Sequence, residues 1–148
     1  MFLKFKIILF LCVLCILCPG YSFSKTFPNN HYMAIVSGKI SKKEVKKSGN
    51  YYYTEYKLKP EKWLFKKPEI KQTKNLTVKI LGADLPKKGL VIKASCAPDF
   101  VPFKEKAIFF LEETARKEKD VFTISKNGII YGSGLKKYEK ALRLKRET

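Results

Sequence analysis

The chain has 148 residues, with 31 Lys and Arg against 13 Asp and Glu, and its formal net charge is +18 at pH 7. This length suits one domain around one core and excludes two independent cores. The positive charge favours encounters with anionic polymers, lipid headgroups or nucleic acid, but it specifies no fold.

The first 24 residues have the pattern of a secretory signal peptide. A short basic start precedes an apolar run of about 12 residues, at 7–18, which ends at a Pro-Gly break. Small residues at Ser22 and Ser24 predict cleavage between Ser24 and Lys25. The run is shorter than the roughly 20 residues of a membrane span. We therefore expect an exported protein, periplasmic or secreted, with a retained N-terminal membrane anchor as the alternative.

Cleavage would leave 29 basic and 13 acidic residues, a net charge of +16. Three of the four cysteines lie in the apolar run, so Cys96 would remain alone and no internal disulfide is expected. Lysine accounts for 28 of the 31 basic residues. Because Lys is a mobile point charge and lacks the bidentate fork of Arg, the excess predicts diffuse attraction. Compositional drift in an AT-rich genome is the alternative explanation of the charge.

Residues 31–131 alternate apolar and polar side chains with period two, which is typical of successive short strands. We expect a first strand over 32–40, a polar connection over 41–50 and a second strand over 51–59. Pro60 has no N–H to donate, so regular pairing should stop or bulge there.

Three further strands are expected in the middle of the chain. Residues 76–80 and 90–94 alternate apolar and polar side chains, so each should form a half-buried strand. Residues 107–111 are apolar throughout, and this strand should be covered on both faces.

The last predicted strands form a hairpin. Asn127 and Gly128 favour the two positive φ values of a type I′ turn, which would join residues 121–126 to residues 129–131.

The period changes after residue 134. Leu135, Tyr138 and Leu142 recur at helical spacing among basic residues, which predicts a short basic amphipathic helix over 135–148. We expect its apolar stripe to cap an open barrel end. The alternative is that the stripe lies on an anionic membrane surface.

Six or seven short strands in about 100 residues predict a mainly β domain, either a closed or nearly closed barrel or a small sandwich. The expected organisation is a signal peptide over 1–24, which includes a signal helix, a β-barrel domain over 25–134 and the basic helix over 135–148.

The layout resembles that of small exported bacterial proteins of unknown function with an OB-like β-barrel domain, over residues 32 to about 132. The similar stretches are AIVSGKI (34–40), YTEYKL (53–58) with WLFK (63–66), and LTVKILG (76–82) with APDF (97–100) and FFLE (109–112). The strand layout is also distantly similar to netrin and metalloproteinase-inhibitor domains. Those domains depend on cysteines, including one at the mature N-terminus, where this chain has Lys25. The resemblance implies a fold and no activity.

The best candidate binding region is the basic and aromatic stretch over residues 42–62. Exposed aromatic rings stack on bases while lysines follow phosphates when OB-type barrels hold single strands. The alternative is cross-strand aromatic packing. The predicted site residues are Tyr51 and Tyr53, on the outward face of the second strand, and the lysines around them, Lys46, Lys47 and Lys57.

The sequence contains few candidate catalytic residues. Cys96, His31 and Asp99 are the only ingredients of a thiol-based triad, and no flanking signature supports one. One His and one Cys fall short of the four ligands of a closed zinc site. We therefore predict a non-enzymatic protein without a metal or a small-molecule cofactor.

The leading functional hypothesis is a binding or interaction module attracted to an anionic envelope polymer, a membrane surface or an acidic protein. The alternative is an OB-like protein that binds single-stranded nucleic acid through exposed tyrosines and lysines. Nucleic acid is the disfavoured partner, because exported proteins seldom meet it and Arg is scarce.

Overall fold

The computed structural model describes residues 31–144, so the predicted signal peptide and its cleavage site lie outside the described residues. This described part of the chain is mainly β, as the sequence predicted, with a short 3₁₀ helix and one α-helix. In chain order the elements are β1 (Ala34–Ser48), β2 (Tyr51–Lys66), β3 (Leu76–Leu85), η1 (Pro86–Lys88), β4 (Leu90–Lys93), β5 (Lys106–Glu113), β6 (Val121–Thr123), β7 (Ile129–Tyr131) and α2 (Ser133–Leu144).

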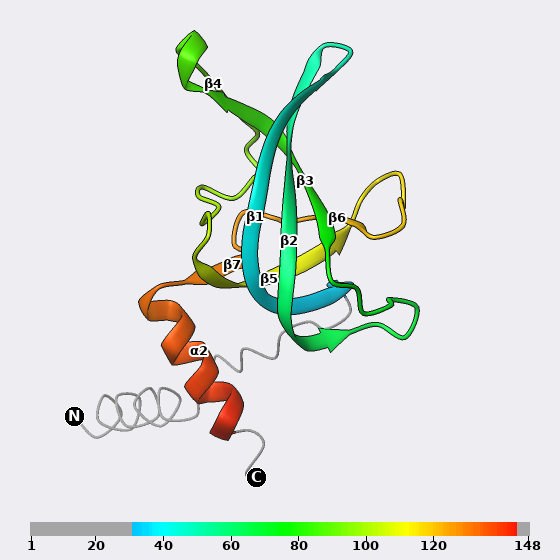
Figure 1. The fold of residues 1–148 in the computed structure, drawn as a ribbon, viewed down its shortest axis with the longest axis vertical. Helices are drawn as coiled ribbons and strands as arrows, with labels where there is room; N and C mark the ends of the chain where they lie inside the picture. The colour runs from blue at the N-terminus through cyan, green and yellow to red at the C-terminus, as the bar shows by residue number, and fades with distance from the viewer. Residues whose placement is uncertain (1–30, 145–148) are drawn as a thin grey trace, which may run out of the picture.

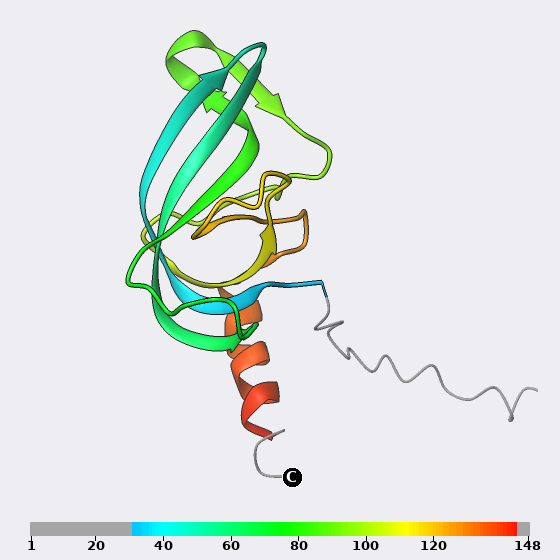
Figure 2. The ribbon, with the colours of Figure 1, turned by 90° about the vertical axis from the view of Figure 1, so that its right-hand side faces the viewer.

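The strands form one seven-stranded mixed sheet that curls into a partial ring (Figures 1 and 2). The strand order is β1-β2-β3-β6-β5-β7, with β4 paired to β3 and a further pairing of β1 with β5. The β3–β6 pairing is parallel, and the other pairings between strands are antiparallel. The hairpins β1–β2 and β3–β4 project from one end of the molecule, and α2 lies at the other (Figures 1 and 2).

The predicted polar connection over 41–50 is wrong, because β1 runs on to Ser48 and only a two-residue turn at Gly49 and Asn50 separates it from β2. Gly49 has a φ of 58°, a conformation that glycine adopts without steric cost. The polar residues of this segment pair along β2, for example Lys46 opposite Tyr53. A strand that projects into solvent can be polar on both faces. The absence of apolar alternation over residues 41–48 therefore did not indicate a loop.

The bulge expected at Pro60 is confirmed, although β2 continues beyond it to Lys66. Gly38 lies opposite Pro60 while the preceding Ser37 lies opposite Lys62, so Glu61 is an extra residue in β2. The two backbones are close here, since a Cβ on Gly38 would lie 2.3 Å from the carbonyl oxygen of Lys59.

Side chains inside the ring form the main core, and β5 supplies its centre. Ala107, Phe109 and Leu111 point inward and are fully buried. They meet inward-facing residues of the other strands, which include Val36, Ile40, Leu58, Leu76, Val78 and Phe122. The inward set at 76, 78 and 80 confirms the predicted half-buried strand.

A second, smaller core lies on the outside of the ring. Ile108 and Phe110 of β5 point away from the main core and pack with Ile35 against Leu135 and Tyr138 of α2. The prediction that residues 107–111 are covered on both faces is therefore confirmed. The helix begins at Ser133, and its stripe covers the outer face of β1 and β5 instead of capping an open end. The reason is that these strands present an apolar outer face, which needs a cover.

The expectation for residues 90–94 is wrong in its burial. Among residues 31–144, strand β4 pairs only with β3, and the residues Leu90–Lys93 are all exposed, Val91 by 71%. Figure 1 shows β4 extending away from the body of the sheet. In the described residues no second layer of secondary structure covers β4. Its alternating apolar residues therefore stay exposed.

The predicted hairpin between residues 121–126 and 129–131 is also wrong. A turn does occur, but at Lys126 and Asn127, one residue earlier than predicted, and neither Asn127 nor Gly128 has the positive φ of a type I′ turn. Strands β6 and β7 do not pair with each other, and both pair with β5. The turn itself is attached to β5, because the Phe110 N–H donates to the Gly128 carbonyl at 2.8 Å. Pairing with a long apolar strand therefore replaced the local hairpin.

Replacement of Tyr138 tests the packing of α2 on the sheet. The Tyr138 and Phe110 ring centroids are 6.0 Å apart in an edge-to-face arrangement. We expect Tyr138→Ala to lower the free energy of unfolding by about 2 kcal/mol. The neighbouring exposed Lys137→Ala should change it by less than about 0.5 kcal/mol. Equal effects in urea denaturation would contradict this packing.

Candidate functional site

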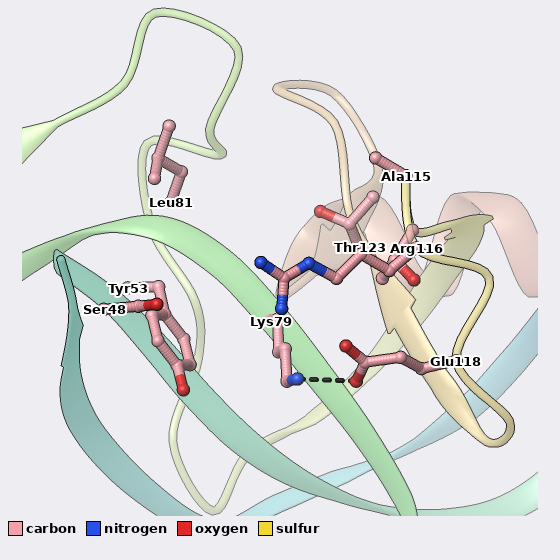
Figure 3. Close-up of a pocket in the computed structure, with 9 residues that line it drawn as sticks. Ser48, Tyr53, Lys79, Leu81, Ala115, Arg116, Glu118 and Thr123 are labelled. Atoms are coloured by element: carbon pink, nitrogen blue, oxygen red, sulfur yellow. Dashed lines mark hydrogen bonds and ion pairs between the residues drawn. The ribbon is translucent and has the colours of Figure 1, made fainter. Parts of the chain in front are cut away.

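A groove of about 390 Å³ lies on the outer face of β2 and β3 (Figure 3). Since residues 76, 78 and 80 of β3 point into the core, its intervening residues Lys79 and Leu81 point outward. The tip of the β1–β2 hairpin and the connection between β5 and β6 flank the groove. Its lining consists of Ser48, Tyr53, Lys79, Leu81, Thr114, Ala115, Arg116, Glu118 and Thr123.

The groove combines positive charge, an aromatic ring and apolar surface. Lys79 Nζ lies 2.6 Å from Glu118 Oε2 and 5.8 Å from the centre of the Tyr53 ring. Leu81 is 50% exposed. Arg116 reaches from the β5–β6 connection toward the middle of the groove (Figure 3), and within residues 31–144 no carboxylate forms an ion pair with it.

An unpartnered hydroxyl adds a hydrogen-bonding group beside Arg116. Thr114 Oγ1 is buried, and the part of the chain that the structure describes offers it no hydrogen-bond partner. Such a group is costly unless a ligand or a water molecule satisfies it. The arrangement suits a ligand that carries both anionic and flat apolar parts.

Most of the residues predicted from the sequence lie on this outer face. Lys46 is opposite Tyr53, and Tyr51 is opposite Ser48, so these side chains share it. Tyr51 is 70% exposed and lies outside the groove, whereas Tyr53 lines it. Lys57 shares the face by strand alternation.

Lys47 lies on the opposite face of the hairpin. It pairs with Tyr52, and its Nζ is 5.5 Å from the centre of that ring. Since adjacent residues of a strand point to opposite faces, Lys47 cannot act together with Tyr53 on the same ligand surface.

Two of the predicted lysines already have a carboxylate partner. Lys46 Nζ lies 3.0 Å from Glu55 Oε2, and Lys57 Nζ lies 3.2 Å from Glu55 Oε1. Lys57 also donates to Thr77 Oγ1 at 2.9 Å. Glu55 is 8% exposed. Lys46 and Lys57 therefore hold β1, β2 and β3 together on this face and have less charge to offer a ligand.

The ion pairs shift the pKa of Glu55 against the effect of its burial. Burial alone would raise the pKa of this carboxyl, but hydrogen bonds from Lys46 and Lys57 and their positive charges outweigh it, so the pKa lies below the ordinary 4.5. The pKa of Lys46 is raised, chiefly by its hydrogen bond to Glu55. Both groups stay charged through the physiological range.

Among the groove residues, only Tyr53 was predicted from the sequence, and Lys79, Leu81, Arg116 and Glu118 were missed together with the smaller lining residues. The alternation over residues 76–80 contained a signal for Lys79, since it placed this side chain on the outer face. Arg116 and Glu118 lie in a connection, and no local pattern predicts which strand face a connection overhangs.

The other candidates from the sequence are not assembled. Asp99 is ion-paired with Lys93, and no hydrogen bond or ion pair joins Cys96, His31 and Asp99 in the described residues. Cys96 is exposed. Over residues 31–144, no three His, Cys, Asp or Glu side chains gather in a way that would hold a metal ion.

Comparisons with protein families, with curated proteins and with solved structures found no match for this chain. The site is therefore interpreted from its own chemistry. Between residues 31 and 144 the structure has no helix long and apolar enough to cross a membrane.

Replacement of Glu55 tests the ionic cluster beneath the site. We expect Glu55→Gln to lower the free energy of unfolding by about 1–3 kcal/mol at pH 7, because two ammonium groups lose their counter-charge and one of them loses its acceptor oxygen. The folded pKa is depressed, so this stabilisation is present above pH 4.5 and is lost as the pH falls through the lower folded value. Urea denaturation from pH 7 to pH 3 measures the difference between the two proteins.

The difference should be constant above about pH 5.5 and shrink below pH 4.5. The exposed Glu69→Gln serves as the control and should show little difference at any pH. A difference between wild type and Glu55→Gln that persists unchanged at pH 3 would contradict this assignment.

Proposed function

We propose that the protein is an exported, non-enzymatic binding module with an OB-like barrel, which holds an extended anionic partner across the outer face of β2 and β3. Export rests on the signal-peptide pattern of residues 1–24. The anionic character of the partner rests on the net charge of +16, from the 29 basic and 13 acidic residues that remain after the predicted cleavage, and on the groove. The partner would be an envelope polymer or an acidic protein.

The strand pairing supports the OB-like barrel. Following the hydrogen-bonded neighbours leads from β1 to β2, β3, β6 and β5 and back to β1, with β3 and β6 parallel. An OB-fold is a five-stranded, partly open Greek-key barrel that binds ligands on its second and third strands, between two flanking loops. The groove occupies the corresponding place, on β2 and β3 between the β1–β2 turn and the β5–β6 connection.

The Arg116 guanidinium is the observation that carries the proposal. It overhangs the groove without a carboxylate partner among the described residues, while Tyr53 and Leu81 offer an aromatic and an apolar surface below. Arg is weakly hydrated and can hold a carboxylate or phosphate with two hydrogen bonds. It is one of only three Arg in the chain, whose positive charge comes mostly from Lys.

The test is the affinity of the protein for anionic and neutral envelope fragments, measured by sedimentation at low and high salt. We expect Arg116→Gln to weaken binding to anionic fragments about tenfold, since a charge-assisted hydrogen bond is lost. Lys87→Gln removes an exposed charge on η1, outside the groove, and should have a much smaller effect. If both variants weaken binding equally, the attraction is diffuse and the groove has no special role. An affinity that does not change between low and high salt would contradict the proposal.

Single-stranded nucleic acid is a second candidate, and the accessible tyrosines Tyr51 and Tyr53 favour it. Base stacking on an aromatic ring is worth about 1–3 kcal/mol per base. We therefore expect Tyr53→Ala to weaken binding of a single-stranded oligonucleotide about tenfold, as measured by fluorescence anisotropy. Tyr52→Ala, on the opposite strand face, is the matched control and should bind as wild type does. Unchanged affinity in Tyr53→Ala would exclude stacking at this site.

A further inference from the structure

A second cavity, of about 290 Å³, lies between α2 and the outer face of the sheet, away from the groove on β2 and β3. Ser37 of β1, Lys62 of β2, Lys106 of β5 and Glu139 of α2 line it. Leu64, Ile108 and Leu142 supply its apolar wall. Four separate elements thus place polar groups around one small space.

The buried hydroxyl of Ser37 is the unusual feature of this cavity. Ser37 lies opposite Lys62 on one side and Ile108 on the other, which places it under α2. The residue is 4% exposed, and its Oγ has no hydrogen-bond partner in the described part of the chain. Buried hydroxyl groups in proteins nearly always have a partner, so this one lacks an acceptor or donor that a ligand can supply.

Two ammonium groups at the cavity are available to an additional acceptor. Lys62 has no carboxylate within ion-pair distance among residues 31–144. Lys106 Nζ lies 3.7 Å from Glu139 Oε1 and 4.0 Å from Glu61 Oε2. Strong charge-assisted hydrogen bonds are about 2.7–2.9 Å long, so these two contacts leave the donors of Lys106 largely unused.

We propose that this cavity binds a small oxyanion, a carboxylate or a phosphate group. The Ser37 hydroxyl donates to it, and the Lys62 and Lys106 ammonium groups neutralise its charge. The site is distinct from the proposed polymer groove and does not rest on that function. A volume of 290 Å³ lies at the lower limit of ligand pockets, about 300–1,000 Å³, so a small ion or metabolite fits and a polymer does not.

An oxyanion reaches the Ser37 hydroxyl only when side chains that line the cavity move. Solvent scarcely touches the Ser37 Oγ, whereas Lys62 and Lys106 are exposed. Exposed side chains change rotamer within nanoseconds, so either lysine can turn to admit an anion and then close on it. Glu139 is the opposing group, since its carboxylate competes with an oxyanion for Lys106.

Titration of the protein with inorganic phosphate tests the site, at constant ionic strength held with chloride. Backbone amide shifts in NMR spectra report the affinity and the place of binding. We expect Ser37→Ala to weaken phosphate binding about tenfold or more, because a hydrogen bond to a charged group is lost. Glu139→Gln should strengthen binding severalfold, because the competing carboxylate is removed.

Lys136→Gln is the matched control, an exposed lysine of the same helix outside the cavity, and it should bind phosphate as wild type does. If Lys136→Gln and Lys62→Gln lower the phosphate affinity equally, the binding is non-specific attraction to positive charge, and the proposal is overturned. Unchanged affinity in both Ser37→Ala and Lys62→Gln would also overturn it. Titration with acetate then distinguishes a carboxylate site from a phosphate site.

The melting temperature of the Ser37→Ala variant distinguishes a loss of stability from a loss of phosphate binding. Ser37→Ala removes a hydroxyl without a partner, so its melting temperature without phosphate should equal or exceed that of the wild type. If the variant is destabilised instead, Lys62→Gln decides the question through phosphate affinity alone. Arg116→Gln should leave phosphate binding at this cavity unchanged, so failure of the polymer groove and failure of this site remain distinguishable.

Discussion

The burial of β5 on both faces is the constraint on which the rest of the structure depends. Ala107, Phe109 and Leu111 fill the inside of the ring, while Ile108 and Phe110 need a cover on the outside. Both edges are paired as well, one with β1 and the other with β6 and β7. The inner residues hold the strands of the partial ring together, and the outer residues bring α2 to the sheet. The cavity at Ser37 exists because α2 is held there.

Ion pairs divide the positive charge into two kinds. Lys46 and Lys57 share Glu55, so this cluster on the outer face is structural and joins neighbouring strands beside the groove. Arg116 and Lys62, in contrast, have no carboxylate partner among the described residues. A net charge therefore says little about where an anion binds, and the positions without a counter-charge are more informative.

The sequence predicted the strands whose pattern is set by local burial and missed those whose partners are distant. Residues 76–80 and 107–111 behaved as expected because their alternation or uniform apolarity reflects the faces that they bury. Residues 41–48 looked like a loop, since a projecting hairpin needs no apolar face. A turn forms at Lys126 and Asn127, one residue before the predicted position. The flanking strands pair with β5 and not with each other, because a local turn signal carries no information about a competing strand.

The sequence by itself determined a mainly β chain, the bulge at Pro60, the double burial of β5 and the outward position of Tyr53, because strand alternation and missing N–H groups act locally. Only the tertiary structure decided that Lys47 lies on the face opposite to Tyr53 and that Arg116 overhangs a groove. It further decided that Glu55 forms ion pairs with Lys46 and Lys57. It also decided that Ser37 meets Lys62 and Lys106 under α2. These contacts join residues far apart in the chain. Pairing register and the curling of the sheet bring them together, and no local pattern encodes either.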